Sequence, residues 1–130
     1  MSTKKSRLLE FEGVKMQPHE KDTILRLRKL NFDAKPVLPT GTSRTPDVFI
    51  GNQLWEIKSP VGFSKKTTIY SQLKRAKKQS EYLVIDTKRT KLPDDFIAIE
   101  LRKLIKFKAF KKIKHILLIK KSGKTLDIER

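Results

Sequence analysis

TPDVFIGNQLWEIKSP, residues 45–60, predicts a β-hairpin from which the rest of the chain can be interpreted. Two runs of β-branched and aromatic residues, Val48–Ile50 and Leu54–Ile57, lie on either side of Gly51-Asn52. Short runs of this kind around a glycine-containing turn are typical of two antiparallel strands. The stretch therefore predicts two adjacent strands joined by a tight turn.

The hairpin also carries three side chains that suit metal-dependent chemistry on a phosphate. Asp47 opens the first strand, and Glu56 and Lys58 lie two residues apart on the second. Since successive strand residues point to opposite faces, Glu56 and Lys58 project together, whereas Trp55 and Ile57 point to the other face. Two carboxylates can bind a divalent cation that acidifies a bound water and stabilises phosphoryl charge. A lysine beside them adds positive charge or orients the attacking water.

A plainer interpretation is a surface hairpin whose charges are ordinary cross-strand neighbours, because a Glu-x-Lys triplet arises by chance in a lysine-rich chain. The metal site is favoured because Pro46-Asp47 lies at hairpin distance from Glu56 and Lys58, and apolar strand residues surround both elements.

Pro46-Asp47 followed by Glu56-Ile57-Lys58 resembles the signature of the PD-(D/E)XK nuclease superfamily. Over roughly residues 15–120, the order of elements also resembles the tRNase-type toxin domains of contact-dependent growth inhibition (CdiA C-terminal) proteins. This wider resemblance is carried by Pro18-His19-Glu20, Asp33-Ala34-Lys35, the segment from Trp55 to Pro60, Lys66-Thr67-Thr68-Ile69 and a helix from Gln72 to Gln79.

The resemblance implies an α/β fold with one PD-(D/E)XK-type domain. Its mixed central β-sheet would be flanked by helices, as an αβββαβ core plus a C-terminal helix and strands. The resemblance further implies that Glu20 assists Asp47 and Glu56 in binding the metal, and that Gln72 is an auxiliary catalytic residue beside Lys58. Glu20 would equally suit the positive end of a helix dipole. The expected cofactor is Mg2+ or another divalent cation such as Mn2+ or Zn2+.

The composition favours a single domain with a polyanionic partner. The chain has 130 residues, with 31 Lys and Arg against 14 Asp and Glu, a formal net charge of +17 and a pI near 10.2. Such an excess is usually tolerated where the partner is a nucleic acid, although an anionic membrane surface or simple solubility would also account for it. The absence of cysteine excludes disulfides and thiolate zinc sites, and no apolar run is long enough for a membrane span.

The elements expected before and after the hairpin complete the domain. Residues 1–14 form a basic N-terminal arm, either loose or a short helix, and residues 15–130 form the nuclease domain. The other predicted elements are a helix from Gln17, an edge strand over Phe32–Leu38, a helix from Thr67 or Thr68 to about Ser80, a buried strand over Tyr82–Asp86, a helix from Pro93, a strand over His115–Ile119 and an edge strand over Thr125–Ile128. The hairpin, the next helix and the strand at Tyr82 form a crossover, which predicts parallel pairing.

Basic residues around the predicted site are candidates for binding nucleic acid. A run of charges is most often a solvated face, but beside a phosphodiester-cutting site phosphate binding is the better interpretation. The candidates are Arg44, Lys65, Lys66, Lys74, Arg75 and Lys78.

These observations predict a divalent-metal-dependent nuclease, and the resemblance favours an RNase toxin that acts on tRNA. It also implies an acidic immunity protein that covers the site, and action in the cytoplasm of a target bacterium if the toxin is delivered. Two alternatives stay open. One is a DNA endonuclease of the same fold, of the repair, resolvase or restriction type, and the other is a non-catalytic basic RNA-binding protein.

Overall fold

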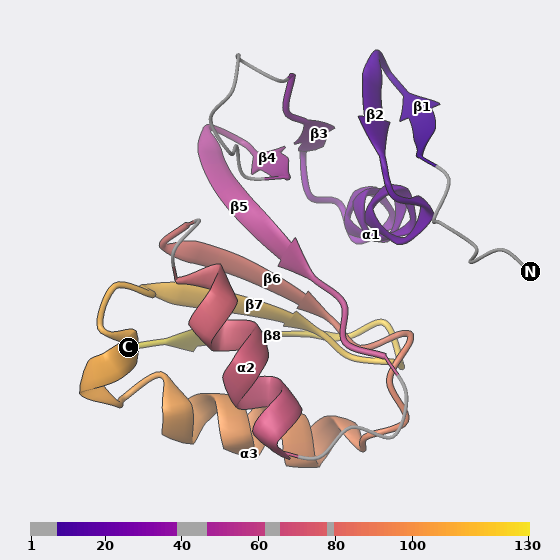
Figure 1. Ribbon diagram of the computed structural model, residues 1–130. Helices are drawn as coiled ribbons and strands as arrows, with labels where there is room; N and C mark the ends of the chain where they lie inside the picture. Colours follow the sequence, from indigo (N-terminus) through magenta and orange to yellow (C-terminus); the bar gives the residue numbers. More distant parts are fainter. Residues whose placement is uncertain (1–7, 39–46, 62–65, 78–79) are drawn as a thin grey trace, which may run out of the picture.

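A mixed six-stranded sheet with helices on both faces forms the centre of the protein (Figure 1). The computed structural model describes residues 8–38, 47–61, 66–77 and 80–130. In spatial order the strands are β3 (Ala34–Pro36), β4 (Val48–Ile50), β5 (Gln53–Lys58), β6 (Tyr82–Asp86), β7 (His115–Ile119) and β8 (Thr125–Glu129). The α-helices are α1 (Pro18–Lys29), α2 (Lys66–Ala76) and α3 (Asp94–Leu104), and a 3-10 turn, η1, covers Lys108–Phe110. The predicted α/β class, with a mixed sheet flanked by helices, is confirmed.

The predicted hairpin is present as β4 and β5, which pair in antiparallel fashion with Val48 opposite Trp55. Gly51 is the first of the two turn residues and has a φ of +61°, a conformation that glycine adopts without steric cost. Its N–H donates to the Asp33 carbonyl at 2.9 Å, which attaches the turn to the chain entering β3. The edge position predicted for this proline-containing strand is also confirmed.

The strands after the hairpin are joined by two helical crossovers. β5 pairs with β6 in parallel, as the crossover pattern predicts, and β6 also pairs with β7 in parallel. α2 ends at Ala76 rather than near Ser80. The difference has a simple reason, because the buried stripe of Ile69, Leu73 and Ala76 has no apolar successor before Tyr82.

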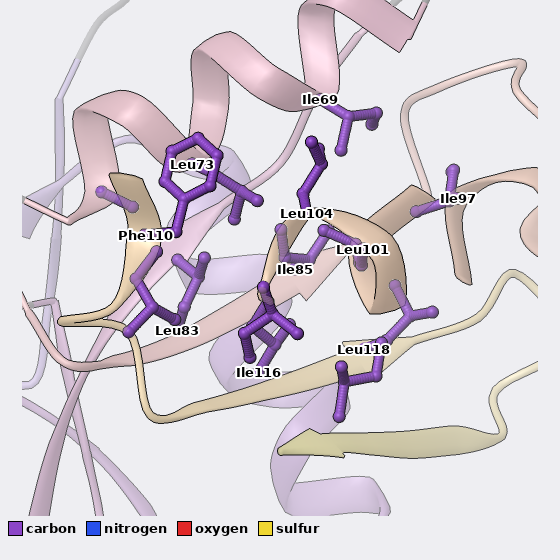
Figure 2. Packing of buried hydrophobic residues seen from close by; sticks show 14 of the residues in the cluster. Ile69, Leu73, Leu83, Ile85, Ile97, Leu101, Leu104, Phe110, Ile116 and Leu118 are labelled. Carbon is purple, nitrogen blue, oxygen red and sulfur yellow. The ribbon is translucent and has the colours of Figure 1, made fainter. Parts of the chain in front are cut away.

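Each face of the sheet has its own hydrophobic core. α2 and α3 cover one face, where Leu83, Ile85 and Leu118 point toward the helices (Figure 2). α1 covers the other face, where Val84, Leu117 and other strand residues that alternate with the first set are buried. This alternation places Trp55 and Ile57 in the α1 core, and so Glu56 and Lys58 belong to the opposite face, as predicted.

The N-terminal segment differs from the expected loose arm or short helix. Residues from 9 onward form an antiparallel hairpin, β1 (Leu9–Phe11) and β2 (Val14–Met16), whose turn residues Glu12 and Gly13 both have positive φ. Val14 and Met16 are buried in the α1 core. The Arg28 guanidinium of α1 binds both carboxylate oxygens of Glu12, at 2.7 and 2.8 Å, and so fixes the turn to the helix. Nothing in the described residues forms a helix long and apolar enough to cross a membrane.

Two isoleucines on α3 offer a matched test of the core. The side chain of Ile97 is fully buried, whereas Ile99 is 59% exposed. Ile97→Ala should lower the free energy of unfolding by about 2–5 kcal/mol, because it removes buried methyl groups and leaves a cavity. Ile99→Ala should change it by less than about 1 kcal/mol. Urea denaturation of both variants measures the difference, and equal losses would contradict the packing described here.

Candidate active site

The predicted catalytic groups meet where β5 extends beyond the start of β4. The Asp47 N–H donates to the Trp55 carbonyl at 3.1 Å, which continues the pairing of the two strands by one bond. Beyond this point β5 has no backbone partner from β4, and the Asp47 carboxylate accepts the Ile57 N–H at 2.9 Å instead. The aspartate therefore both closes the hairpin and lies against β5 at the level of Glu56.

Glu56 and Lys58 form a mostly buried ion pair on the face of the sheet that α2 and α3 cover. The Lys58 Nζ lies 3.4 Å from Glu56 Oε2, and the two side chains are 17% and 5% exposed. Their parallel neighbours on β6 are Leu83 and Ile85, which belong to the core on that face. A charged pair held this far from solvent keeps its geometry and interacts more strongly than a surface pair.

Asp47 has a strongly altered ionisation. Burial, followed by the negative charges of Glu56 and then Glu20, raises the pKa of the Asp47 carboxyl group to about 8. The Ile57 N–H and the charge of Lys58 act in the opposite direction but only partly offset the rise. Negative charges gathered at one place disfavour ionisation of each carboxyl group. A cation bound there would reverse this effect and favour the ionised forms.

Glu20 contributes to this site from the first turn of α1. Its charge is one cause of the raised pKa of Asp47, so the structure brings the two carboxyl groups near each other. Glu20 Oε1 also accepts the Gln17 N–H at 2.9 Å and thereby caps the helix. The capping role and the site role are thus compatible in one residue.

The donor set suits a magnesium-like ion better than zinc. Within the described ranges, no group of three or more His, Cys, Asp or Glu side chains is gathered closely enough to hold a metal by itself. Catalytic zinc usually takes three protein ligands, whereas Mg2+ keeps several waters and needs only one or two carboxylates together with substrate phosphate. Asp47 and Glu56, with Glu20 nearby, fit the second pattern.

The remaining predicted residues are distributed around α2. Gln72 is half-buried and Lys74 and Arg75 are exposed, on the helix that covers the Glu56 face. Lys66 begins α2, but its side chain is not described. Arg44, Lys65 and Lys78 lie outside the described residues. The roles of Gln72 and of these basic side chains stay predictions.

Arg89 and His19 are close to the site, although the sequence did not single them out. Arg89, in the loop after β6, donates from Nε to Ser59 Oγ at 3.0 Å and from Nη2 to the Ser59 carbonyl at 2.7 Å, and Ser59 directly follows Lys58. Burial lowers the pKa of His19, and the charge of Arg89 lowers it further. The sequence showed only a basic loop after β6, and a loop pattern cannot reveal which residue it reaches.

Comparison with known proteins gives one family and one solved structure. Residues 44–125 match the family model described as "Contact-dependent growth inhibition CdiA C-terminal domain". The fold is similar to that in the "CdiA-CT/CdiI toxin and immunity complex from Burkholderia pseudomallei", with a TM-score of 0.70 and 12% identity over 97% of this chain and 98% of that chain. At this identity the likeness shows the fold alone. No curated protein matches the sequence.

The raised pKa of Asp47 predicts a pH-dependent effect of Asp47→Asn on stability in EDTA. Since the folded-state pKa lies above the unfolded value of about 3.9, ionisation opposes folding and the wild-type protein loses stability as pH rises toward 8. The asparagine cannot ionise but can still accept the Ile57 N–H. The variant should therefore melt higher than the wild type by roughly 5 °C or more at pH 9, with a smaller difference at pH 5.

Asp33→Asn is the matched control for this measurement, because Asp33 is exposed. The difference between its melting temperature and that of the wild type should stay the same as the pH rises. A difference for Asp47→Asn that is the same at pH 5, 7 and 9 would contradict the assigned ionisation.

Proposed function

This chain belongs to the contact-dependent growth inhibition CdiA C-terminal domain family, and on that basis we propose that it is a divalent-metal-dependent nuclease of the PD-(D/E)XK type. Family membership makes it a growth-inhibition toxin domain. The finer proposal is that it hydrolyses phosphodiester bonds in RNA, with tRNA as substrate, in the cytoplasm of a target bacterium. The preference for RNA over DNA rests on the resemblance to the tRNase-type toxins.

One observation carries the nuclease proposal. Asp47, Glu56 and Lys58 meet at one position of the sheet, and burial there, together with the negative charges of Glu56 and Glu20, raises the pKa of Asp47 to about 8. A fold gains no stability from crowded, buried carboxylates, and perturbed groups of this kind are typical of functional sites. A basic RNA-binding protein without catalysis would not need this arrangement.

In the proposed mechanism each residue has a separate task. Asp47 and Glu56, assisted by Glu20, would hold a divalent cation, which when bound supplies an acidified water and positive charge for the phosphoryl oxygens. Lys58 places its ammonium group beside Glu56, where it stabilises negative charge that develops on the phosphate. Gln72 would orient the water or the substrate from α2.

An acidic immunity protein is the proposed partner. The similar solved structure is titled as a complex of a toxin with its immunity protein. The net charge of +17 would speed association of this chain with an acidic protein, just as it would with RNA. Coverage of the carboxylate site by that partner would block both the cation and the substrate.

Cleavage of purified nucleic acids tests the proposal directly. Wild-type protein with Mg2+ should convert total tRNA into discrete fragments, and EDTA or Asp47→Ala should abolish them because the cation is no longer held. Lys58→Met should slow the reaction by roughly 10²–10³-fold through loss of charge stabilisation. Asp33→Ala is the control and should cut at the wild-type rate.

The same assay separates the alternatives when plasmid DNA is included. Cleavage of DNA alone would replace the RNase by a DNA endonuclease. Binding of both nucleic acids without cleavage in Mg2+, Mn2+ or Zn2+ would leave a basic binding protein. Induced expression in bacteria adds a cellular measurement, because the wild type should arrest growth whereas Asp47→Ala should not.

Metal binding can also be measured without turnover. Excess Mg2+ or Mn2+ should raise the melting temperature of the wild-type protein, since a ligand of the folded state alone stabilises it. The rise should be larger at pH 8 than at pH 6, because the cation competes with the proton on Asp47. Glu56→Gln should remove most of the rise, and an undiminished rise would show that the cation binds elsewhere.

A further inference from the structure

We infer that the RNA strand reaches the proposed catalytic site along the outer face of α1, in a groove from Arg89 to Lys29, and that Arg89 binds the phosphate next to the site. This inference rests on the proposed function. It places the main nucleic-acid contacts on α1 and the loop after β6, rather than on the α2 residues that the sequence pointed to.

The position of Arg89 is the first observation. Its guanidinium is held by two hydrogen bonds to Ser59, the residue after Lys58. Its positive charge therefore lies beside the end of β5, the strand that carries Glu56 and Lys58. Both bonds use Nε and Nη2, and among the described residues Nη1 has no hydrogen-bond partner. An arginine fixed on one side and open on the other is suited to bind a phosphate with little loss of side-chain entropy.

Two neighbouring hollows along α1 are the second observation. One pocket of about 290 Å³ is lined by Gln17, Pro18, His19, Asp22 and Arg89. A second of about 440 Å³ is lined by Asp22, Leu25, Arg26, Lys29 and Lys88. The two pockets share Asp22 and therefore adjoin, and we take them together as the groove. Its wall is a single helix face, because the polar residues at positions 19, 22, 26 and 29 are spaced by three, four and three. Their span is about 15 Å at the rise of an α-helix.

The charges in the groove divide into available and neutralised ones. Lys29, Lys88 and Arg89 are exposed. Arg26 is already paired with the buried Asp86 and donates to the Lys120 carbonyl at 2.8 Å, so it supports the wall rather than the substrate. Asp22 carries the opposing charge and is exposed. Three available cations against one carboxylate give an electropositive groove that ends beside Glu20, the neighbour of His19.

The basic side chains that the structure describes on α2 differ from those of the groove. Lys77 donates to the Ala109 carbonyl at 2.9 Å and lies over the Phe110 ring, so it is engaged in the fold. Lys74 and Arg75 are exposed on α2, on the other side of the sheet from α1. Such residues attract RNA through their charge alone. The α1 groove adds a concave surface and an arginine whose side chain is fixed by hydrogen bonds.

Binding of a labelled tRNA tests the inference, with Asp47→Ala present in every protein so that the RNA stays intact. The variant Lys29→Ala/Lys88→Ala/Arg89→Ala should weaken binding at least tenfold at 150 mM salt. It should also lower the slope of log Kobs against log salt concentration by roughly two, because three phosphate contacts are lost. The control Lys106→Ala/Lys108→Ala/Lys112→Ala removes the same charge from exposed positions after α3. It should change affinity much less.

Further variants separate the groove from net charge. Asp22→Asn should tighten binding, because it removes the one carboxylate that faces the phosphates. Equal weakening by the two triple variants, at matched melting temperatures, would overturn the inference, as would weakening of binding by Asp22→Asn. If the wild-type protein cuts no nucleic acid, the proposed function fails instead. Normal cutting by a groove variant with unchanged binding refutes the groove alone.

Discussion

The bond from the Ile57 N–H to the Asp47 carboxylate is the constraint on which the site depends. β5 is longer than β4, and the backbone donor left at this edge is satisfied by a side chain instead of a strand. A buried donor without a partner would cost roughly 1–3 kcal/mol. The same bond holds Asp47 against Glu56, in surroundings that disfavour its ionised form. One hydrogen bond therefore serves folding and brings the acidic groups together.

Most of the sheet could be predicted from the sequence because its signals are local. The Gly51-Asn52 turn set the register of the hairpin, and period-two alternation assigned Glu56 and Lys58 to one face. The N-terminal hairpin was missed although Leu9, Phe11, Val14 and Met16 alternate around Glu12-Gly13. Its strands are only three residues long, and their burial depends on α1 and on the long-range pair of Arg28 with Glu12, which no local pattern reveals.

The site was predictable in part for the same reason. Asp47, Glu56 and Lys58 lie on one hairpin, so their proximity follows from strand geometry. Glu20 belongs to another layer of the fold, and only the family resemblance assigned it to the site. Arg89 is separated from Ser59 by a crossover helix and a strand, and the contact exists only once β5 and β6 are paired in parallel. Side chains joined by tertiary pairing leave no spacing in the sequence to detect.

The two separate cores have a consequence for control of the proposed nuclease activity. Glu20 and His19 belong to the layer formed by α1 and the N-terminal hairpin, whereas Lys58 and the α2 side chains belong to the opposite layer. The sheet lies between the two layers (Figure 1), and the site lies where β5 ends. The proposed mechanism, in which Glu20 assists the metal site, would thus require α1 to be docked on the sheet. For the proposed nuclease, an inhibitor that displaced α1 from the sheet would move Glu20 away from the site while leaving Asp47 and Glu56 in place, so inhibition need not cover the active centre.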